Sequence, residues 1–205
     1  MIPRLYPVVD AAFFSATDEL IAFAAELVAG GCTLLQYRNK NGNARQMLEQ
    51  ARELKRRLAS RRAAVRVLMN DRADLCLAAG FDGVHVGQED LSPESVRAII
   101  GPERWLGVST HNPEQVAAAD LTSADYLAIG PVFSTSSKEN PDPVVGLEGV
   151  RRARELTRKP LVAIGGITRA NAASVIAAGA DSVAVISDLF IDPRKSAEAF
   201  LSILG

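Results

Sequence analysis

The sequence predicts an α/β fold, a single TIM barrel of the (β/α)8 type with eight parallel strands. Short apolar runs alternate with segments of helical periodicity along the 205 residues, which gives eight strand–helix pairs. Several runs are apolar throughout, as at 161–164 and 183–186, which is typical of strands covered by helices on both faces. An Ala-Gly step before a new run recurs at 29–30, 79–80 and 178–179. A closed barrel is favoured over an open doubly wound sheet, because no G-x-G-x-x-G loop follows any strand.

The first half of the chain holds four of the predicted pairs. Apolar runs predict strands over 5–10, 32–38, 65–70 and 83–87. Apolar residues recur at helical spacing over 18–30 and 44–61, and a short helix over 71–79 ends at Gly80, a typical C-terminal stop. The fourth helix starts at Ser92, a good N-cap that precedes a proline at the first helical position.

The second half repeats this alternation. Strands are predicted over 105–110, 126–132, 161–167 and 183–187. The cap-plus-proline start recurs at Asn112-Pro113, and helices are expected over 147–157, from a cap at Thr168 to residue 178, and over 193–204. The polar connection 133–146 is long for a barrel of this size, so it is a candidate active-site lid.

Composition excludes several function classes. Lys and Arg number 23 and Asp and Glu 24, so the net charge of −1 argues against a general nucleic-acid or membrane-surface partner. There is no apolar run of about 18 residues and no secretion-signal pattern. Cys32 and Cys76 stand in apolar runs, as expected of buried thiols in a reducing compartment, and no zinc-ligand spacing occurs. We therefore expect one domain over 1–205 in the cytoplasm; a homo-oligomer is left open.

Polar side chains gather where the predicted strands end. The ends carry Asp10, residues 36–40, 70–72, 85–90 and 109–111, the segment 135–138, Gly165-Gly166 and Ser187-Asp188. Strand starts are mostly apolar by contrast. Since the chemistry of such barrels sits at the carboxyl ends of the strands, this distribution predicts one functional mouth.

Two groups of charges within this mouth point to a polyphosphate and a metal. Gln36, Arg38 and Lys40 alternate, so an extended chain presents all three on one side, which suits a phosphate or diphosphate. A solvated strand end is the alternative. Asp71 and Asp90 end adjacent strands and could supply two oxygen ligands to Mg²⁺. Their alternatives are a helix N-cap at Asp71 and a simple loop residue at Asp90.

The remaining polar positions allow two interpretations each. Gly165-Gly166 and the pair Ile186-Ser187 could let backbone amides approach a phosphate at the ends of the last two strands, or form plain turns. His85 lies within an apolar strand and is expected to be a core residue. His111 could be a general acid or base, or cap a helix.

Six motifs in order resemble the thiamine-phosphate synthase family over nearly the whole chain. They are Gln-Tyr-Arg-Asn-Lys at 36–40, Asn-Asp-Arg at 70–72, Gly-Gln-Glu-Asp-Leu at 87–91, Gly-Val-Ser-Thr-His at 107–111, Gly-Pro-Val-Phe at 130–133 and Ala-Ile-Gly-Gly-Ile at 163–167. The resemblance implies that a hydroxymethylpyrimidine diphosphate is coupled with a thiazole phosphate to give thiamine phosphate and diphosphate. It also implies that the diphosphate leaves first and that the thiazole nitrogen traps the resulting cation.

The resemblance also implies roles for individual residues. The pyrimidine diphosphate would be bound by Gln36, Arg38, Lys40, Asn70, Ser109 and Lys138. Among these, Arg38, Ser109 and Lys138 would act in catalysis, and Mg²⁺ would be held by Asp71 and Asp90. The thiazole phosphate would be bound by Thr135, Ser136, Ser137, Gly166, Ile186 and Ser187.

The chain departs from the family pattern at three places. Gln-Tyr-Arg-Asn-Lys at 36–40 stands for the usual Gln-Leu-Arg-Glu-Lys, which leaves the three alternating residues intact. Thr135-Ser136-Ser137-Lys138 stands for the usual Thr-x-Thr-Lys, which keeps the hydroxyl groups, and Asp188 adds a negative charge where a small residue is usual. Two rival functions stay open at this point: a thiazole tautomerase on the same barrel, with His111 moving the proton, and a non-catalytic binder of thiazole or thiamine phosphates.

Overall fold

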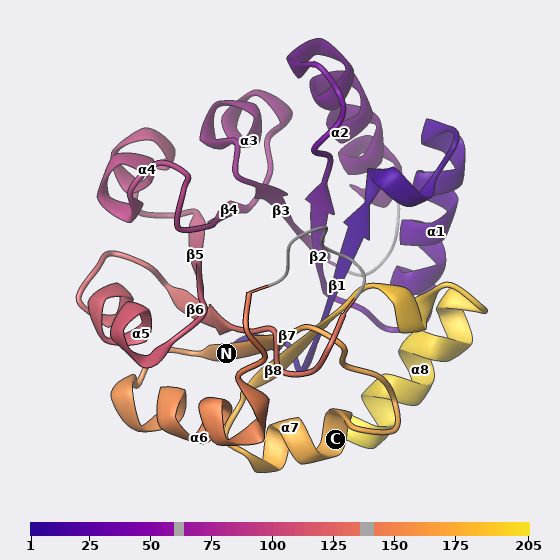
Figure 1. Ribbon diagram of the computed structural model, residues 1–205. Coiled ribbons are helices and arrows are strands. Elements are labelled where there is room, and N and C mark those ends of the chain that lie inside the picture. Colours follow the sequence, from indigo (N-terminus) through magenta and orange to yellow (C-terminus); the bar gives the residue numbers. More distant parts are fainter. Residues whose placement is uncertain (60–63, 136–141) are drawn as a thin grey trace.

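The computed structural model describes residues 1–59, 64–135 and 142–205, and within them eight parallel strands form a closed barrel in the order β1 to β8 (Figure 1). Closure comes from β1, which pairs with β2 through Asp10 and Arg38 and with β8 through Leu5 and Val183. The strands are β1 (Leu5–Asp10), β2 (Leu34–Arg38), β3 (Arg66–Asn70), β4 (Gly83–Val86), β5 (Trp105–Thr110), β6 (Tyr126–Ile129), β7 (Leu161–Ile164) and β8 (Ser182–Val185). The predicted fold class is confirmed.

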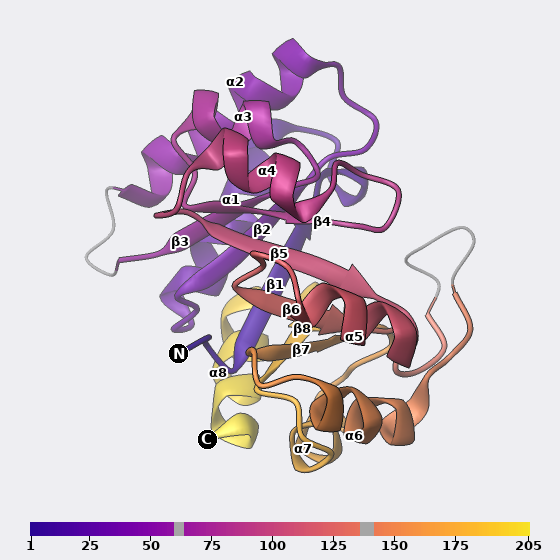
Figure 2. The same cartoon turned by 90° about the vertical axis from the view of Figure 1, so that its left-hand side faces the viewer.

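Helices surround the barrel, and Figure 2 shows both chain termini at the end where the strands begin. The helices are α1 (Thr17–Ala29), α2 (Ala44–Ala59), α3 (Ala73–Ala79), α4 (Pro93–Ile100), α5 (Pro113–Asp120), α6 (Gly146–Leu156), α7 (Ala172–Ala177) and α8 (Pro193–Leu204). Two short 3-10 helices, η1 (Ala11–Phe13) and η2 (Ser187–Leu189), follow β1 and β8 and were not predicted. No helix in the described ranges is both long and apolar enough to cross a membrane.

The caps explain where most helices begin. The Ser92 hydroxyl accepts from Ser95 N at 3.3 Å and Asn112 Oδ1 accepts from Gln115 N at 2.9 Å, which confirms both predicted starts. The predicted cap at Thr168 is wrong: α7 begins at Ala172, and Asn171 Oδ1 accepts from Thr168 N at 2.8 Å. The asparagine therefore closes a turn ahead of the helix, and three residues of the predicted helix, 169–171, belong to that turn.

Several predicted elements extend too far at the end that faces the mouth, which is the carboxyl end of a strand and the amino end of a helix. Strand β7 stops at Ile164 because Gly165 and Gly166 take positive φ angles of 100° and 63°, and β8 stops at Val185, with one residue between it and η2. Helix α3 begins at Ala73 and not at Asp71, whose φ of 62° lies outside the helical region. These terminal residues leave the regular elements and turn toward the mouth.

The core has two parts. The larger lies between strands and helices, and a smaller cluster fills the inside of the barrel with Tyr6, Leu34, Leu68, Tyr126 and Val162, all at 1% exposure or less. The inner cluster is a packed plug, as in other barrels of this type, so a ligand can enter only above it. Two of its members are tyrosines, which need hydrogen-bond partners when buried.

Candidate active site

A cavity of about 790 Å³ opens at the carboxyl ends of the strands. Side chains or backbone from all eight strands or the residues just after them line it. Every predicted site residue in the described ranges borders this one cavity: Gln36, Arg38, Lys40, Asn70, Asp71, Asp90, Ser109, Thr135, Gly166, Ile186 and Ser187. Ser136, Ser137 and Lys138 lie outside the described residues. Gly87, Gln88, Glu89, Gln115 and Asp142 also border the cavity and were not singled out from the sequence as ligand-binding residues.

Arg38 and Lys40, the two cations predicted to bind a phosphate or diphosphate, each pair with a carboxylate. Arg38 Nη1 forms an ion pair with Asp10, whose side chain is 2% exposed and also accepts from Ala12 N at 3.0 Å. Lys40 Nζ lies 2.5 Å from Asp71 Oδ2. Asp10 was noticed at its strand end, but its pairing with Arg38 was not predicted. The carboxylates aim both cations into the cavity mouth.

Asp71 and Asp90 meet, as the metal hypothesis requires. The backbone N of Asp71 donates to His85 O at 2.8 Å, and Asp90 Oδ2 accepts from Gly87 N at 2.7 Å. Burial and contact with the Asp90 carboxyl raise the pKa of Asp71 against the opposing pull of Lys40. The N-cap alternative for Asp71 is wrong, because Arg72 occupies that position and makes no side-chain cap.

This pair of carboxyl groups suits a cation that needs few protein ligands. Among the described residues, no group of three or more His, Cys, Asp or Glu side chains is arranged to hold a metal ion. Two carboxyls in contact, with Lys40 Nζ beside Asp71, nevertheless fit Mg²⁺, which completes its shell with water and phosphate oxygens.

A chain of buried hydrogen bonds forms the floor of the cavity; we call it the relay. Gln36 Nε2 donates to Tyr6 Oη at 2.8 Å, and Tyr6 Oη lies 3.0 Å from Tyr126 Oη. Tyr126 Oη lies 2.9 Å from His85 Nδ1, and His85 Nε2 lies 2.8 Å from Ser109 Oγ. Burial lowers the pKa of His85 to about 4, so the ring is neutral near pH 7.

His85 is buried and hydrogen-bonded, as the core interpretation expected, but it also borders the cavity. Neither Tyr6 nor Tyr126 was predicted to take part in a site. Each stands in an apolar strand and is indistinguishable there from a core aromatic. The signal that could have found them is a buried tyrosine on the inward face of a barrel strand, because its hydroxyl must find a partner inside.

One wall of the cavity is formed by glycines and the start of η2. A side chain on Gly166 would place its Cβ 2.5 Å from Ser134 O, so only glycine lets these two segments lie so close. Ile186 and Ser187 border the cavity beside it. Asp188 does not add an uncompensated charge here: its carboxylate accepts from Arg169 Nε and from Arg169 N, both at 2.9 Å. The departure at position 188 is therefore neutralised locally.

His111 does not cap a helix with its side chain. Its Nδ1 lies 2.6 Å from Gly130 O and 3.5 Å from Asp142 Oδ2, and its backbone N donates to Gln115 Oε1 at 2.7 Å. Asn112 provides the cap of α5 instead. The ring holds the rim of the cavity between β5 and β6.

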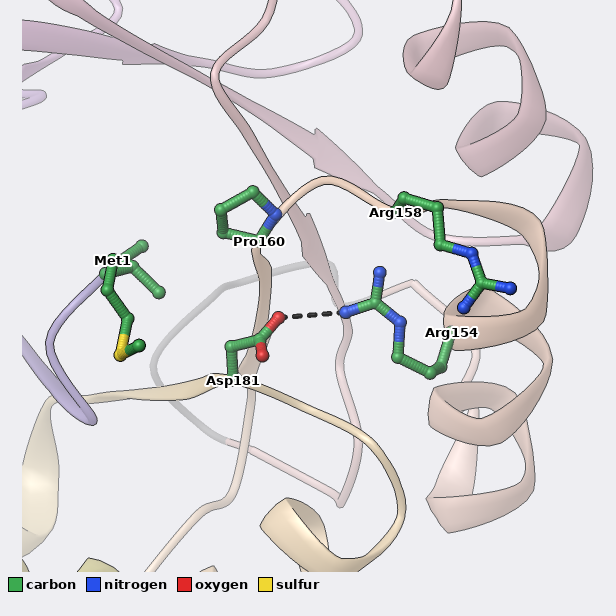
Figure 3. A pocket seen from close by; sticks show the side chains of 6 residues that line it. Met1, Arg154, Arg158, Pro160 and Asp181 are labelled. Carbon is green, nitrogen blue, oxygen red and sulfur yellow. Dashed lines mark hydrogen bonds and ion pairs between the residues drawn. The ribbon is translucent and has the colours of Figure 1, made fainter.

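A second, smaller cavity of about 290 Å³ lies at the other end of the barrel, beside Met1 and Pro160 (Figure 3). Arg154 Nη1 donates to Asp181 Oδ2 at 2.8 Å, and the same guanidinium also donates to Thr157 O and Lys159 O. Asp181 in turn accepts from Leu161 N at 2.8 Å. These bonds fix the start of β7 and leave no convergent set of groups for chemistry.

Comparisons with known proteins agree with this site. A family model described as thiamine monophosphate synthase matches residues 5–189. A thiamine-phosphate synthase from Koribacter versatilis is 63% identical over 99% of this chain and 96% of its own length, and one from Chloroflexus aurantiacus is 46% identical over 90% and 83%. The structure of a thiamine phosphate pyrophosphorylase from Pyrococcus furiosus superposes with a TM-score of 0.85 at 34% identity, covering 98% of this chain and 95% of that one. The chain belongs to the thiamine monophosphate synthase family.

Proposed function

We propose that the protein is a transferase that couples 4-amino-2-methyl-5-(diphosphooxymethyl)pyrimidine with 4-methyl-5-(2-phosphooxyethyl)thiazole. The products are thiamine phosphate and diphosphate. The observation that carries the proposal is the convergence of cations, paired carboxyls and a glycine-lined wall on one cavity, in a member of this family. A binder of a single phosphate would need one of these features and not all three.

The cationic wall is where the diphosphate of the pyrimidine substrate is expected to bind. Arg38 supplies a planar guanidinium already oriented by Asp10, and Lys40 supplies a point charge at the rim. Asn70 and Ser109 border the same space with an amide and a hydroxyl. By family resemblance Lys138 joins this group. Together they stabilise the charge that develops on the diphosphate as the methylene C–O bond breaks.

Asp71 and Asp90 are the residues that would hold Mg²⁺. A magnesium ion bound there would supply positive charge beside the leaving diphosphate. The chain's own contribution is to keep the two carboxyls together: the Asp71 backbone is tied to His85 and the Asp90 side chain to Gly87.

The wall that Gly166 and the start of η2 form is where the thiazole phosphate is expected to bind, at Gly166, Ile186, Ser187 and Thr135, with Ser136 and Ser137 added by resemblance. A phosphate anchored there would direct the thiazole nitrogen toward the pyrimidine methylene carbon. The nitrogen lone pair forms the new C–N bond, while the electron pair of the broken C–O bond leaves with the diphosphate. Positioning two bound substrates in one cavity supplies much of the acceleration.

The deciding experiment mixes purified protein, Mg²⁺ and both substrates and measures thiamine phosphate and diphosphate. We expect equimolar products, with Asp71→Ala and Lys138→Ala each lowering turnover by roughly 100-fold. Asp74→Ala is the matched control for Asp71, because Asp74 pairs with Arg72 at 2.6 Å outside the cavity lining. Thiazole isomerisation without coupling, or tight binding without turnover, would overturn the proposal.

Family resemblance and two buried free thiols also support the cytoplasm as the expected compartment.

A further inference from the structure

The relay has a direction, which follows from counting its protons. A tyrosine hydroxyl donates one hydrogen bond and can accept two. Tyr6 Oη accepts from Gln36 Nε2, and its other side-chain partner in the described ranges is Tyr126 Oη, so the buried Tyr6 proton is satisfied when Tyr6 donates to Tyr126. Tyr126 has then accepted from Tyr6, and its proton is left for His85 Nδ1. A neutral imidazole whose Nδ1 accepts carries its proton on Nε2, which donates to Ser109 Oγ. Each bond thus fixes the next.

The barrel makes room for this arrangement at Gly107. The strand register puts His85 beside Gly107 and Gly107 beside Tyr126, so the glycine lies between the two rings. A Cβ at position 107 would lie 2.1 Å from Tyr126 Cζ and 2.4 Å from His85 Nδ1. The φ of Gly107 is not positive, so no backbone need accounts for the glycine. Its lack of a side chain allows the hydrogen bond between the tyrosine and the histidine.

The two ends of the relay both border the cavity. At one end, Ser109 Oγ accepts a hydrogen bond from the Nε2–H group of His85, so the hydroxyl proton of Ser109 can be donated to a ligand. At the other end, the side-chain hydrogen bond that Gln36 makes within the described ranges uses its nitrogen and leaves its oxygen for a ligand. The floor therefore offers one donor and one acceptor to whatever lies on it.

We propose that Tyr6, Tyr126 and His85 are positioning residues that lock this direction, so that Ser109 meets the ligand as a donor and Gln36 as an acceptor. Reversal would require the Gln36 amide to turn over and the His85 proton to move to Nδ1, and it would invert both ends together. The ligand assignment rests on the proposed function: an aminopyrimidine has N–H donors for Gln36 and ring nitrogens that accept from Ser109.

The first test reads the His85 tautomer in the ligand-free protein. The chain has two histidines, so ¹⁵N-histidine labelling gives two sets of imidazole signals, and His111→Asn assigns them. At pH 7.5 we expect His85 to show a protonated Nε2 and an unprotonated Nδ1. A protonated Nδ1 in the unmodified protein would overturn the proposal without any substitution in the relay.

The second test reverses the relay from its far end. An ionised carboxylate at position 36 can only accept, so Gln36→Glu should make Tyr6 donate to it, Tyr126 donate to Tyr6, and His85 donate from Nδ1. In Gln36→Glu we expect the proton of His85 to be on Nδ1 and not on Nε2 at every pH between 7 and 9. Adding Tyr6→Phe to Gln36→Glu should block the reversal and return the Nε2–H form.

Tyr37→Phe is the matched control, since Tyr37 is also a buried tyrosine but donates to Gln50 Oε1 at 2.7 Å outside the relay. It should leave the His85 tautomer unchanged. A folded Gln36→Glu protein that keeps the Nε2–H form at every pH, or a reversal that persists with Tyr6→Phe, would refute the proposed relay. Because these spectra need no substrate, failure of the coupling assay would leave the relay intact, and failure here would leave the proposed reaction intact.

Discussion

Gly166 and Gly80 form a matched pair that separates backbone strain from lack of space. Their φ angles are 63° and 68°, so an alanine at either position must adopt the left-handed region. That conformation costs an L residue roughly 1–2 kcal/mol. At Gly80, which ends α3, a Cβ would have no atom within 4 Å. At Gly166 it would lie 2.5 Å from Ser134 O and 2.8 Å from Phe133 Cβ.

The expected destabilisation follows from this difference. Gly80→Ala should lower the free energy of unfolding by the conformational cost alone, about 1–2 kcal/mol. Gly166→Ala should lose roughly 1–3 kcal/mol more, because the backbone carbonyl of Ser134 cannot move without shifting the segment after β6. For a domain of this size each kcal/mol lowers Tm by about 2–4 °C, so the two variants should differ by about 6 °C.

Calorimetry and urea titration on both variants, at one pH and salt concentration, measure that difference. Because Gly166 also borders the cavity, its alanine variant should raise KM for the thiazole phosphate, whereas Gly80→Ala should not. Equal losses of stability in the two variants would refute the argument that close approach to Ser134 is what requires glycine at 166.

Three further predictions concern the Asp71–Asp90 carboxyl pair, the expected thiazole-phosphate site beside Asp188, and the two cysteine thiols. Mg²⁺ at 100 times its Kd should raise the free energy of unfolding by about 3 kcal/mol. Asp71→Asn should abolish this stabilisation in a thermal-shift titration, and an unchanged stabilisation would place the metal elsewhere. Arg169→Gln removes the cation that pairs with Asp188, so the Asp188 carboxylate should repel the thiazole phosphate and raise its KM several-fold at low salt and less at high salt. An unchanged KM at low salt would show that the Asp188 charge does not act on the bound phosphate. Burial raises the pKa of Cys32 to about 12 and that of Cys76 to about 11, so at pH 8 both thiols are less ionised than in the unfolded chain. Iodoacetamide should therefore label both cysteines in urea and neither in the folded protein, as counted by mass spectrometry. Labelling of the folded protein would contradict this.

The barrel was predictable because its signal is repeated. Each strand is a short apolar run and each helix has its own periodicity, so errors at one boundary leave the count of eight pairs unchanged. The mouth was predictable for a related reason: parallel strands place all their carboxyl ends on one side, so polar ends must converge once the barrel is accepted.

What could not be predicted depends on register and on local backbone angles. The Asp10–Arg38 pair requires these two residues to be aligned across β1 and β2, which the sequence of either strand does not show. The sequence left a metal ligand and a helix N-cap open for Asp71, and the left-handed φ that excludes the N-cap is a local backbone angle that the sequence does not show. Tyr6 and Tyr126 meet through the barrel interior, 120 positions apart, so neither strand alone suggests their hydrogen bond.

The ion pairs at the mouth influence how strongly an anion can bind in the cavity. Arg38 and Lys40 already have counter-ions in Asp10 and Asp71, so an incoming anion must displace or share a carboxylate and does not simply replace water. Its measured affinity is therefore the surplus left after those contacts are rearranged. Chloride has one charge and no oxygen atom, and sulfate has two charges and four oxygens, so both gain less from that exchange than a diphosphate does. A diphosphate, with more charge and more oxygens, can compensate both cations at once, so we expect the resident carboxylates to favour it over the small anions of the surrounding solution.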